Sequence, residues 1–224
     1  MQLEIDRADL LPGEGWARAA DRLVPGTGPV LAVDLSGDPL VFATYAGHVL
    51  ACRPMTEGDL GDVARWVDAP HVARWWDHPG SAVGEHIGPA LRGEDPTRMW
   101  VWEVNGRSVG FAQDYRIADH PDFALLCGHP DAVGFDYAIG EPAYVGRGLG
   151  TSLLWVLLRD IVAPAYPGVP ELFAAPDHRN VASLRVLDKL GATRGVWFDE
   201  PQADGRSTTV VGCGIDVERV LGST

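Results

Sequence analysis

A glycine-rich segment between two apolar stretches constrains this chain more than any other feature. Residues 133–140 form a short apolar run, and residues 144–151 follow with glycines at positions 146, 148 and 150. Residues 152–159 are apolar and free of glycine, which predicts a helix. A strand followed by a glycine loop and a helix N-terminus exposes several backbone N–H groups in one place. That arrangement suits a phosphorylated ligand.

Two better-known phosphate loops do not fit this segment. A dinucleotide fingerprint needs G-x-G-x-x-G, but Thr151 stands where the third glycine would be, and no Gly-Lys-Ser/Thr follows as in a P-loop. What remains is a loop in which Arg147 adds positive charge and Thr151 can cap the helix or donate a hydrogen bond. A tight turn without a ligand is the alternative interpretation.

Composition limits the possible partners. The 224 residues are 46% hydrophobic, which fits one large domain or one domain with an appendage, and the net charge is −13. Such a surface disfavours nucleic acid and anionic membranes and favours cationic ligands, although solubility alone would also explain it. Three widely spaced cysteines and histidines without a ligand spacing predict free thiols and no metal site. The N-terminus lacks a signal-like pattern, so we expect a cytoplasmic protein.

The remaining pattern predicts a mixed α/β sheet. Asn105-Gly106 is a strong hairpin signal, and Thr56 with Asp59 approximates a capping box at a helix start. Residues 116–132 are predicted to be a polar loop. The other predicted elements are strands at 30–34, 40–45, 48–53, 99–104, 108–115, 171–175, 195–198 and 208–215, and helices at 16–23, 81–91 and 181–190.

These segments resemble the GNAT superfamily of N-acetyltransferases. Residues 145–151 resemble its acetyl-CoA pyrophosphate loop, residues 177–183 its segment in which an Asn lies along the pantetheine arm, and residues 189–192 its usual helix end. The resemblance covers about residues 48–217 of the chain. It implies an α/β GNAT fold, with a mixed, mostly antiparallel sheet flanked by helices and a splayed central strand pair. It also implies an acetyltransferase domain at 46–224. Residues 1–45 lie outside the resemblance, and the two strands predicted around Ser36-Gly37-Asp38-Pro39 make them an N-terminal extension with a β-hairpin.

The implied acyl donor is acetyl-CoA. Carried over position by position, the resemblance assigns cofactor binding to Tyr137, Ala138, Ile139, Val145, Gly146, Arg147, Gly148, Leu149, Gly150, Thr151, Asn180 and Ser183.

Two subfamilies fit. Residues 74–76, 110–115 and 134–136 resemble aminoglycoside 6′-N-acetyltransferases, whereas the Trp-rich helix end and residues 176–180 also resemble siderophore-type lysine N-acyltransferases. The siderophore enzymes usually carry a His where Asp136 stands, which favours acetylation of an aminoglycoside 6′-amine or a similar polyamine. A siderophore-type lysine or hydroxylysine N-acyltransferase and a non-catalytic acyl-CoA-binding module are the alternatives.

The chemistry needs a base, because an amine must be neutral to attack a thioester. Asp136 is the candidate that holds and deprotonates the amine, and backbone N–H groups of residues 135–139 could stabilise the oxyanion. Aromatic faces suit sugars and cations, which favours Trp75 and Trp76 as substrate contacts. The resemblance adds Asp122, because the aminoglycoside enzymes place a substrate-binding Asp at this offset, nine residues after Gln113. The predicted substrate-binding residues are Trp75, Trp76, Asp77, Gln113, Asp114, Asp122 and Asp136. The alternatives are that Asp136 only caps a loop, that Asp122 is one more acid in a polar loop, and that one Trp belongs to the core.

Two positions depart from the family pattern. Residues 185–188 contain no Tyr to protonate the CoA thiolate, and Ala175 stands before Pro176 where an Asp is usual. His120 and His129 are interpreted as solvated loop residues, with a proton relay as the alternative. The expected partner is a small cationic amine, with no nucleic acid and no membrane. The choice between monomer and homodimer stays open.

Overall fold

The structure is a computed structural model that describes residues 27–34, 39–45, 48–202 and 205–221, with the backbone alone before residue 48. Nine strands form one sheet in the order β1-β2-β3-β4-β5-β6-β7-β9-β8. Neighbouring strands pair antiparallel except β6 and β7, which run parallel. The mixed α/β fold with a mostly antiparallel sheet is therefore confirmed. The predicted helix at 16–23 lies outside the described residues.

The strands are β1 (Thr27–Asp34), β2 (Pro39–Tyr45), β3 (His48–Pro54), β4 (Arg98–Val104), β5 (Arg107–Arg116), β6 (Val133–Ile139), β7 (Glu171–Ala174), β8 (Thr193–Pro201) and β9 (Ser207–Asp216). The helices are α2 (Leu60–Val67), α3 (Pro70–Ala73), α4 (Val83–Leu91), α5 (Pro121–Cys127), α6 (Leu149–Leu157), α7 (Ala163–Ala165), α8 (Val181–Lys189) and α9 (Val217–Leu221). A π-helical turn, Leu158–Val162, joins α6 to α7.

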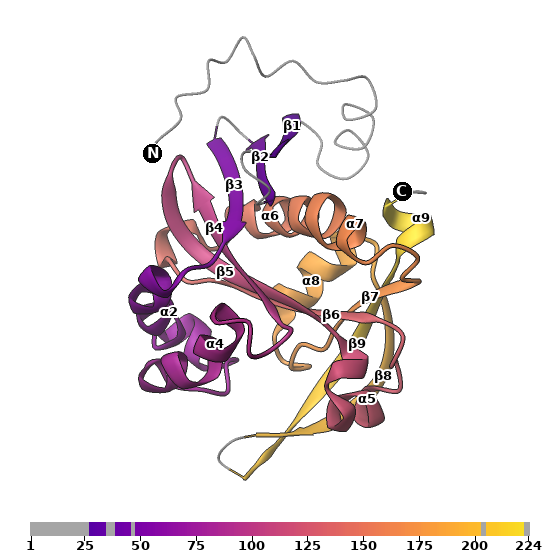
Figure 1. Cartoon of the computed structure of the whole chain (residues 1–224). Coiled ribbons are helices and arrows are strands. Elements are labelled where there is room, and N and C mark those ends of the chain that lie inside the picture. The colour runs from indigo at the N-terminus through magenta and orange to yellow at the C-terminus, as the bar shows by residue number, and fades with distance from the viewer. Residues whose placement is uncertain (1–26, 35–38, 46–47, 203–204, 222–224) are drawn as a thin grey trace.

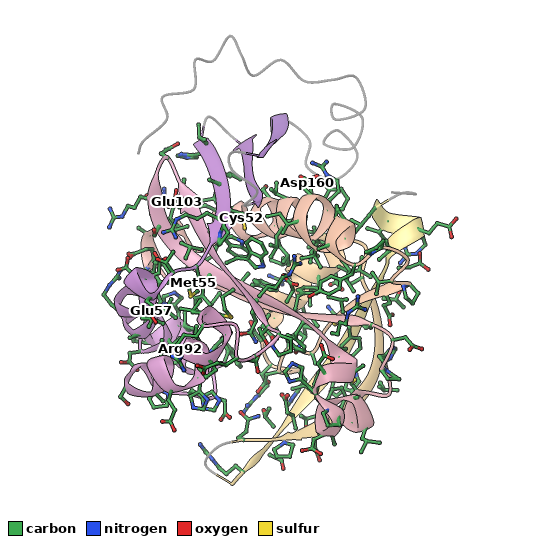
Figure 2. All side chains as sticks on the ribbon, in the orientation of Figure 1. Cys52, Met55, Glu57, Arg92, Glu103 and Asp160 are labelled. Carbon is green, nitrogen blue, oxygen red and sulfur yellow. The ribbon has the colours of Figure 1, made fainter. Side chains whose placement is uncertain are left out.

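Helices cover both faces of the sheet. Helices α2 and α4 lie on one face, and α6 and α8 lie on the other (Figure 1). Successive side chains of β4 point to opposite faces of the sheet, so the strand contributes to both layers. Val101 packs on the side of α2 and α4, and Trp102 packs on the side of α6. Figure 2 labels one β3 residue and the residue just after that strand, Cys52 and Met55, which belong to the α6 layer and the α2 layer respectively.

The parallel pair β6 and β7 separates after two residues. Val133 pairs with Leu172 and Gly134 with Phe173, and the register ends there. On its other edge, β6 pairs with β5 along its whole length, from Val133 to Ile139. Residues 135–139 therefore keep one edge without a strand partner in the described part of the chain, which confirms the predicted splayed strand pair.

Local signals fix the turns. Asn105 and Gly106 have φ angles of 52° and 74°, the left-handed pair that a two-residue hairpin turn requires. The prediction of a continuous loop at 116–132 is wrong, because α5 lies within it. Pro121 stands in the first turn of α5 and Gly128 ends it with φ 73°, which is the usual placement of these residues at helix ends.

The N-terminal strands extend the sheet. β1 and β2 pair antiparallel, and β2 pairs with β3 from Val41 opposite Cys52 to Tyr45 opposite His48. The residues of the predicted turn between β1 and β2 lie outside the described part. The division into an extension at 1–45 and a domain at 46–224 stays a prediction.

Candidate active site

A cleft of about 960 Å³ opens where β6 and β7 separate. The segment after α3, helix α4 and the chain that follows it into β4 line one part of the cleft. The strands β5 and β6, His120, the connection from β7 into α8, and the β8–β9 hairpin line the rest. Of the predicted site residues, the structure brings together Trp75, Trp76, Asp77, Gln113, Asp136, Tyr137, Asn180 and Ser183.

Asp136 is half-buried in this cleft. Gln113 lies directly opposite it on β5, and Gln113 Nε2 donates a hydrogen bond of 2.9 Å to Asp136 Oδ2. The Tyr115 hydroxyl also bonds this carboxylate. Burial raises the pKa of Asp136, and the two hydrogen bonds oppose that rise. The carboxylate is thus fixed in place by donors from β5.

Asp114 does not belong to the site. Its side chain is 0% exposed and accepts hydrogen bonds from Trp100 Nε1 at 2.6 Å, Arg98 Nε at 2.8 Å and the Tyr166 hydroxyl at 2.9 Å. Successive strand residues point to opposite faces, so Gln113 and Asp114 cannot both face the cleft. The prediction that Asp114 binds substrate is wrong, and its role is to join β4, β5 and the end of α7.

Asp122 is also outside the cleft. It is an exposed residue in the first turn of α5, and it does not line the cavity. Because residues 121–127 are helical, the offset that placed Asp122 near Gln113 in the sequence does not carry it to the site. A contact between Asp122 and the substrate stays a prediction.

Trp75, Trp76 and Asp77 form one wall of the cleft. Both indoles are half-buried, and Trp76 packs edge-on against core residue Phe111 with ring centroids 4.8 Å apart. The Arg74 guanidinium lies 5.8 Å from the Trp75 ring centroid. Trp76 thus joins the wall to the core, while Trp75 lines the cleft with Arg74 over its ring.

Tyr137 and Ser183 connect the cleft to α8. The Tyr137 hydroxyl lies 2.9 Å from Ser183 Oγ, and burial raises the pKa of Tyr137. Asn180 is the N-cap of α8, where its Oδ1 accepts the Ser183 N–H at 3.2 Å. These three side chains lie beside the free edge of β6, where an extended ligand arm could pass.

The glycine loop, residues 145–151, follows the C-terminal end of β6. Gly146 and Gly148 have φ angles of 75° and 79°, and Gly148 is the N-cap of the nine-residue helix α6. Val145, Arg147 and both glycines are exposed, whereas Leu149 and Thr151 are buried. Free N–H groups at this helix N-terminus can hold a pyrophosphate.

The tight fit around Gly150 positions this loop. A Cβ at Gly150 would come within 3.3 Å of Ile139 Cδ1 at the end of β6. Ala138 packs against the α2 layer. The path from the loop to the cleft thus follows Ile139, Ala138 and Tyr137, which the sequence assigned to the cofactor.

Sequence reasoning missed two groups around Asp136, Glu200 and Tyr115, and placed a third, His120, in solvent. Glu200 on β8 lines the cleft, and burial together with the charges of Asp136 and Asp77 raises its pKa to about 7. Tyr115 bonds Asp136, and its pKa is raised by burial. His120 is not a solvated loop residue: it is half-buried, lines the cleft and packs edge-on against Tyr115 at 4.7 Å. The sequence predicted the two strands at 195–198 and 208–215, but not that their hairpin would line the cleft.

Other expectations concern metals, thiols and membranes. Cys52, Cys127 and Cys213 are buried free thiols, as predicted. Among the described residues, no three His, Cys, Asp or Glu side chains gather as metal ligands. Within the same residues, no helix is long and apolar enough to cross a membrane.

Comparison with known proteins places the chain in a family. The model of the acetyltransferase (GNAT) domain matches residues 55–199. Aminoglycoside N(6′)-acetyltransferase type 1 of Klebsiella pneumoniae is 26% identical over 166 residues, covering 68% of this chain and 78% of that protein. Lysine N-acyltransferase MbtK of Mycobacterium tuberculosis (strain H37Rv) is 28% identical over 158 residues, covering 68% and 72%.

Solved structures agree with that placement. The crystal structure of aminoglycoside acetyltransferase AAC(6′)-Ib with coenzyme A and kanamycin has a TM-score of 0.64 at 25% identity, covering 76% of this chain and 98% of that one. An aminoglycoside N(6′)-acetyltransferase from Legionella pneumophila has the same fold, with a TM-score of 0.59 at 17% identity.

The chain belongs to the GNAT acetyltransferase family, whose members use acetyl-CoA. The predicted class, an acetyl-CoA-dependent N-acetyltransferase, is confirmed at the level of the family. Within that family it is homologous to aminoglycoside N(6′)-acetyltransferases, with the MbtK lysine acyltransferases as further relatives.

Proposed function

We propose that this enzyme transfers the acetyl group of acetyl-CoA to a primary amine of an aminoglycoside, with the 6′-amine as the predicted position, or of a similar polyamine. The observation that carries the proposal is a fixed carboxylate, Asp136, in a cleft that opens onto the free edge of β6. The cleft also presents Trp75, Asp77 and Glu200, which suit a cationic, sugar-like acceptor. The proposed site of action is the cytoplasm.

Acetyl-CoA would bind along the splayed strands. Its pyrophosphate would lie against the N–H groups at Gly146, Gly148 and the start of α6, and its pantetheine arm along residues 137–139 and Asn180. Backbone N–H groups on the free edge of β6 would stabilise the oxyanion of the tetrahedral intermediate. These assignments rest on the geometry of the loop, the strand edge and the helix α8.

Asp136 would hold the acceptor amine beside the thioester. The amine reaches the enzyme as an ammonium, so a proton must leave before its lone pair can attack. We propose that Asp136, or a group that interacts with Asp136, accepts this proton. Gln113 and Tyr115 keep the carboxylate oriented toward the cleft.

The test is a thiol-release assay with acetyl-CoA and a panel of amines that includes kanamycin. We expect CoA release with aminoglycosides, a product heavier by one acetyl group, and a loss of about 10²–10⁴-fold in kcat in Asp136→Asn. Asp199→Asn, an exposed acid outside the cleft, should keep wild-type activity. Absence of turnover with every aminoglycoside would sink the proposal.

The similarity to MbtK keeps one second candidate, acyl transfer to the side-chain amine of lysine or hydroxylysine. Long-chain acyl-CoA with such an amine belongs in the same panel. Transfer to that acceptor, with none to aminoglycosides, would establish the second candidate instead.

A further inference from the structure

Glu200 lines the candidate active site, although it is far from Asp136 in the sequence. It lies on β8 opposite Thr208 of β9, and this hairpin closes one side of the cleft. Its strand neighbour Phe198, two residues earlier and thus on the same face, packs with the cluster that includes Tyr115 and Phe123. Glu200 therefore faces β5 and β6, where Asp136 lies.

The intervening residue on β8 points the other way. Asp199 is exposed, and its Oδ1 accepts a hydrogen bond of 2.7 Å from Thr209 Oγ1, its partner across the strand pair. Asp199 does not line the cleft. Asp199 thus points to solvent, whereas Glu200 points into the cleft.

The two carboxylates in the cleft differ in their partners. Asp136 accepts hydrogen bonds from Gln113 and Tyr115, which stabilise its charged form and fix its position. The Glu200 carboxylate has no hydrogen-bond donor among the described residues, and its pKa responds only to burial and to neighbouring negative charges. An unbonded carboxylate that is half-buried beside other acids is the group in the cleft best able to gain a proton.

We propose that Glu200 accepts the proton that the acceptor ammonium loses, while Asp136 holds that nitrogen beside the thioester. This inference rests on the proposed acetyl transfer and names its proton acceptor. The ammonium gives one proton to Glu200, and the freed lone pair forms the C–N bond to the thioester carbonyl. The C–S bond breaks, the second N–H proton passes through water to the CoA thiolate, and Glu200 releases its proton to solvent through the open cleft.

The electrostatics of the cleft agree with this assignment. The negative charges of Asp136 on β6 and Asp77 after α3 add to burial in raising the pKa of Glu200 to about 7. Tyr115 on β5 feels the charge of Glu200, and His120 before α5 and Arg206 of the hairpin line the same cleft. A general base is most effective when its pKa lies near the working pH.

The test compares pH profiles of kcat at saturating acetyl-CoA and amine, from pH 5 to 9. We expect wild-type kcat to fall below about pH 7, following deprotonation of Glu200. Glu200→Gln should lose about 100-fold in kcat and lose that acidic limb, whereas Glu200→Asp should keep the limb. Asp136→Asn should move the limb to lower pH, because the Asp136 charge raises the pKa of Glu200.

Controls separate this role from a structural one. Asp199→Asn removes the same charge from the same strand and should leave both kcat and its pH profile unchanged. Calorimetry should show that Glu200→Gln binds acetyl-CoA as the wild type does. A Glu200→Gln enzyme with the wild-type acidic limb and less than a threefold change in kcat would overturn the assignment, as would a loss confined to KM.

Failure of the proposed function gives a different result. If aminoglycosides give no turnover but a lysine-type acceptor does, the same pH profiles are measured with that acceptor. The role of Glu200 is then judged by those profiles, independently of the aminoglycoside result. Absence of turnover with both acceptors overturns it.

Discussion

Two acids on neighbouring strands lie on opposite faces of the sheet, and their substitutions should have opposite consequences. Asp114 pairs with Phe135 and Asp136 pairs with Gln113 in the β5–β6 register. We predict that Asp114→Asn lowers stability and leaves the KM for the amine unchanged. Asp136→Asn should instead lower kcat with little loss of stability, because its partners Gln113 and Tyr115 are uncharged and the oxygen of Asn can still accept a hydrogen bond from one of them.

The size of the Asp114 effect follows from its partners. Its Oδ2 accepts from Arg98 Nε at 2.8 Å and from the Tyr166 hydroxyl at 2.9 Å, and Asn can keep only the bond from Trp100 to the other oxygen. Breaking a buried charge pair costs about 3–5 kcal/mol. The Arg98 side chain is 31% exposed and can reach water, which favours the lower end of that range. At about 2–4 °C per kcal/mol for a chain of this size, Tm should fall by about 6–12 °C.

Urea unfolding and steady-state kinetics at 20 °C would measure both halves of this prediction. Asp122→Asn, which removes an exposed acid, is the stability control and should change the free energy of unfolding by less than about 0.5 kcal/mol. A loss below about 1 kcal/mol in Asp114→Asn, or a tenfold rise in its KM for the amine, would refute the assignment of Asp114 to a structural network.

Three further predictions concern the cleft and the loop. The folded state raises the pKa of Glu200 to about 7, so the stability of the protein declines as pH rises from the ordinary pKa of a Glu toward that value. Glu200→Gln should therefore raise Tm at pH 8 but not at pH 4, and thermal melts at the two pH values would measure this. Gly148→Ala strains a φ of 79° at the start of α6 and should raise the KM for acetyl-CoA about tenfold, whereas Gly168→Ala, at φ 78° outside the site, should not. Trp75→Ala should raise the KM for the amine with little loss of Tm. Trp76→Ala should lower Tm, since Trp76 packs edge-on against core residue Phe111.

The sequence predicted best those features that local chemistry decides. The glycine loop between β6 and α6 and the Asn105–Gly106 turn follow from backbone preferences of single residues, and both lie where the sequence placed them. Strand alternation was also available, and it would have excluded Asp114 once Gln113 was assigned to the site. The helix at α5 had its own signals, since Pro121 and Gly128 bracket it.

Glu200 was beyond sequence reasoning because long-range geometry decides its role. The sequence predicted a strand only at 195–198, whereas β8 extends to Pro201 and carries Glu200 over the cleft. Nothing local distinguishes Glu200 from Asp199, its solvent-facing neighbour. Their difference arises from the pairing of β8 with β9 and from the packing of Phe198.

The splay of β6 from β7 also explains how the reaction can proceed without a helical tyrosine. Asp136 and Tyr137 are adjacent and point to opposite faces, yet both line the cleft, because no strand of the described chain fills the gap beside them. In the proposed reaction, a thioester in that gap would meet the amine on the Asp136 side and release sulfur toward Tyr137 and Ser183. Leu187, one of the residues 185–188 among which the family usually carries the acid, is buried in the core.

The pKa of Tyr137 decides what that side chain can contribute. Burial raises the pKa of Tyr137 above its ordinary value, whereas a thiol ordinarily has a pKa near 8.5. A full proton transfer from this phenol to the thiolate is therefore uphill, and Tyr137 can stabilise the leaving sulfur only as a hydrogen-bond donor. Tyr137→Phe should accordingly lower kcat by about tenfold, the value of one hydrogen bond to a charged group, without moving either limb of the pH profile. A shifted alkaline limb in that variant would show instead that Tyr137 ionises during turnover.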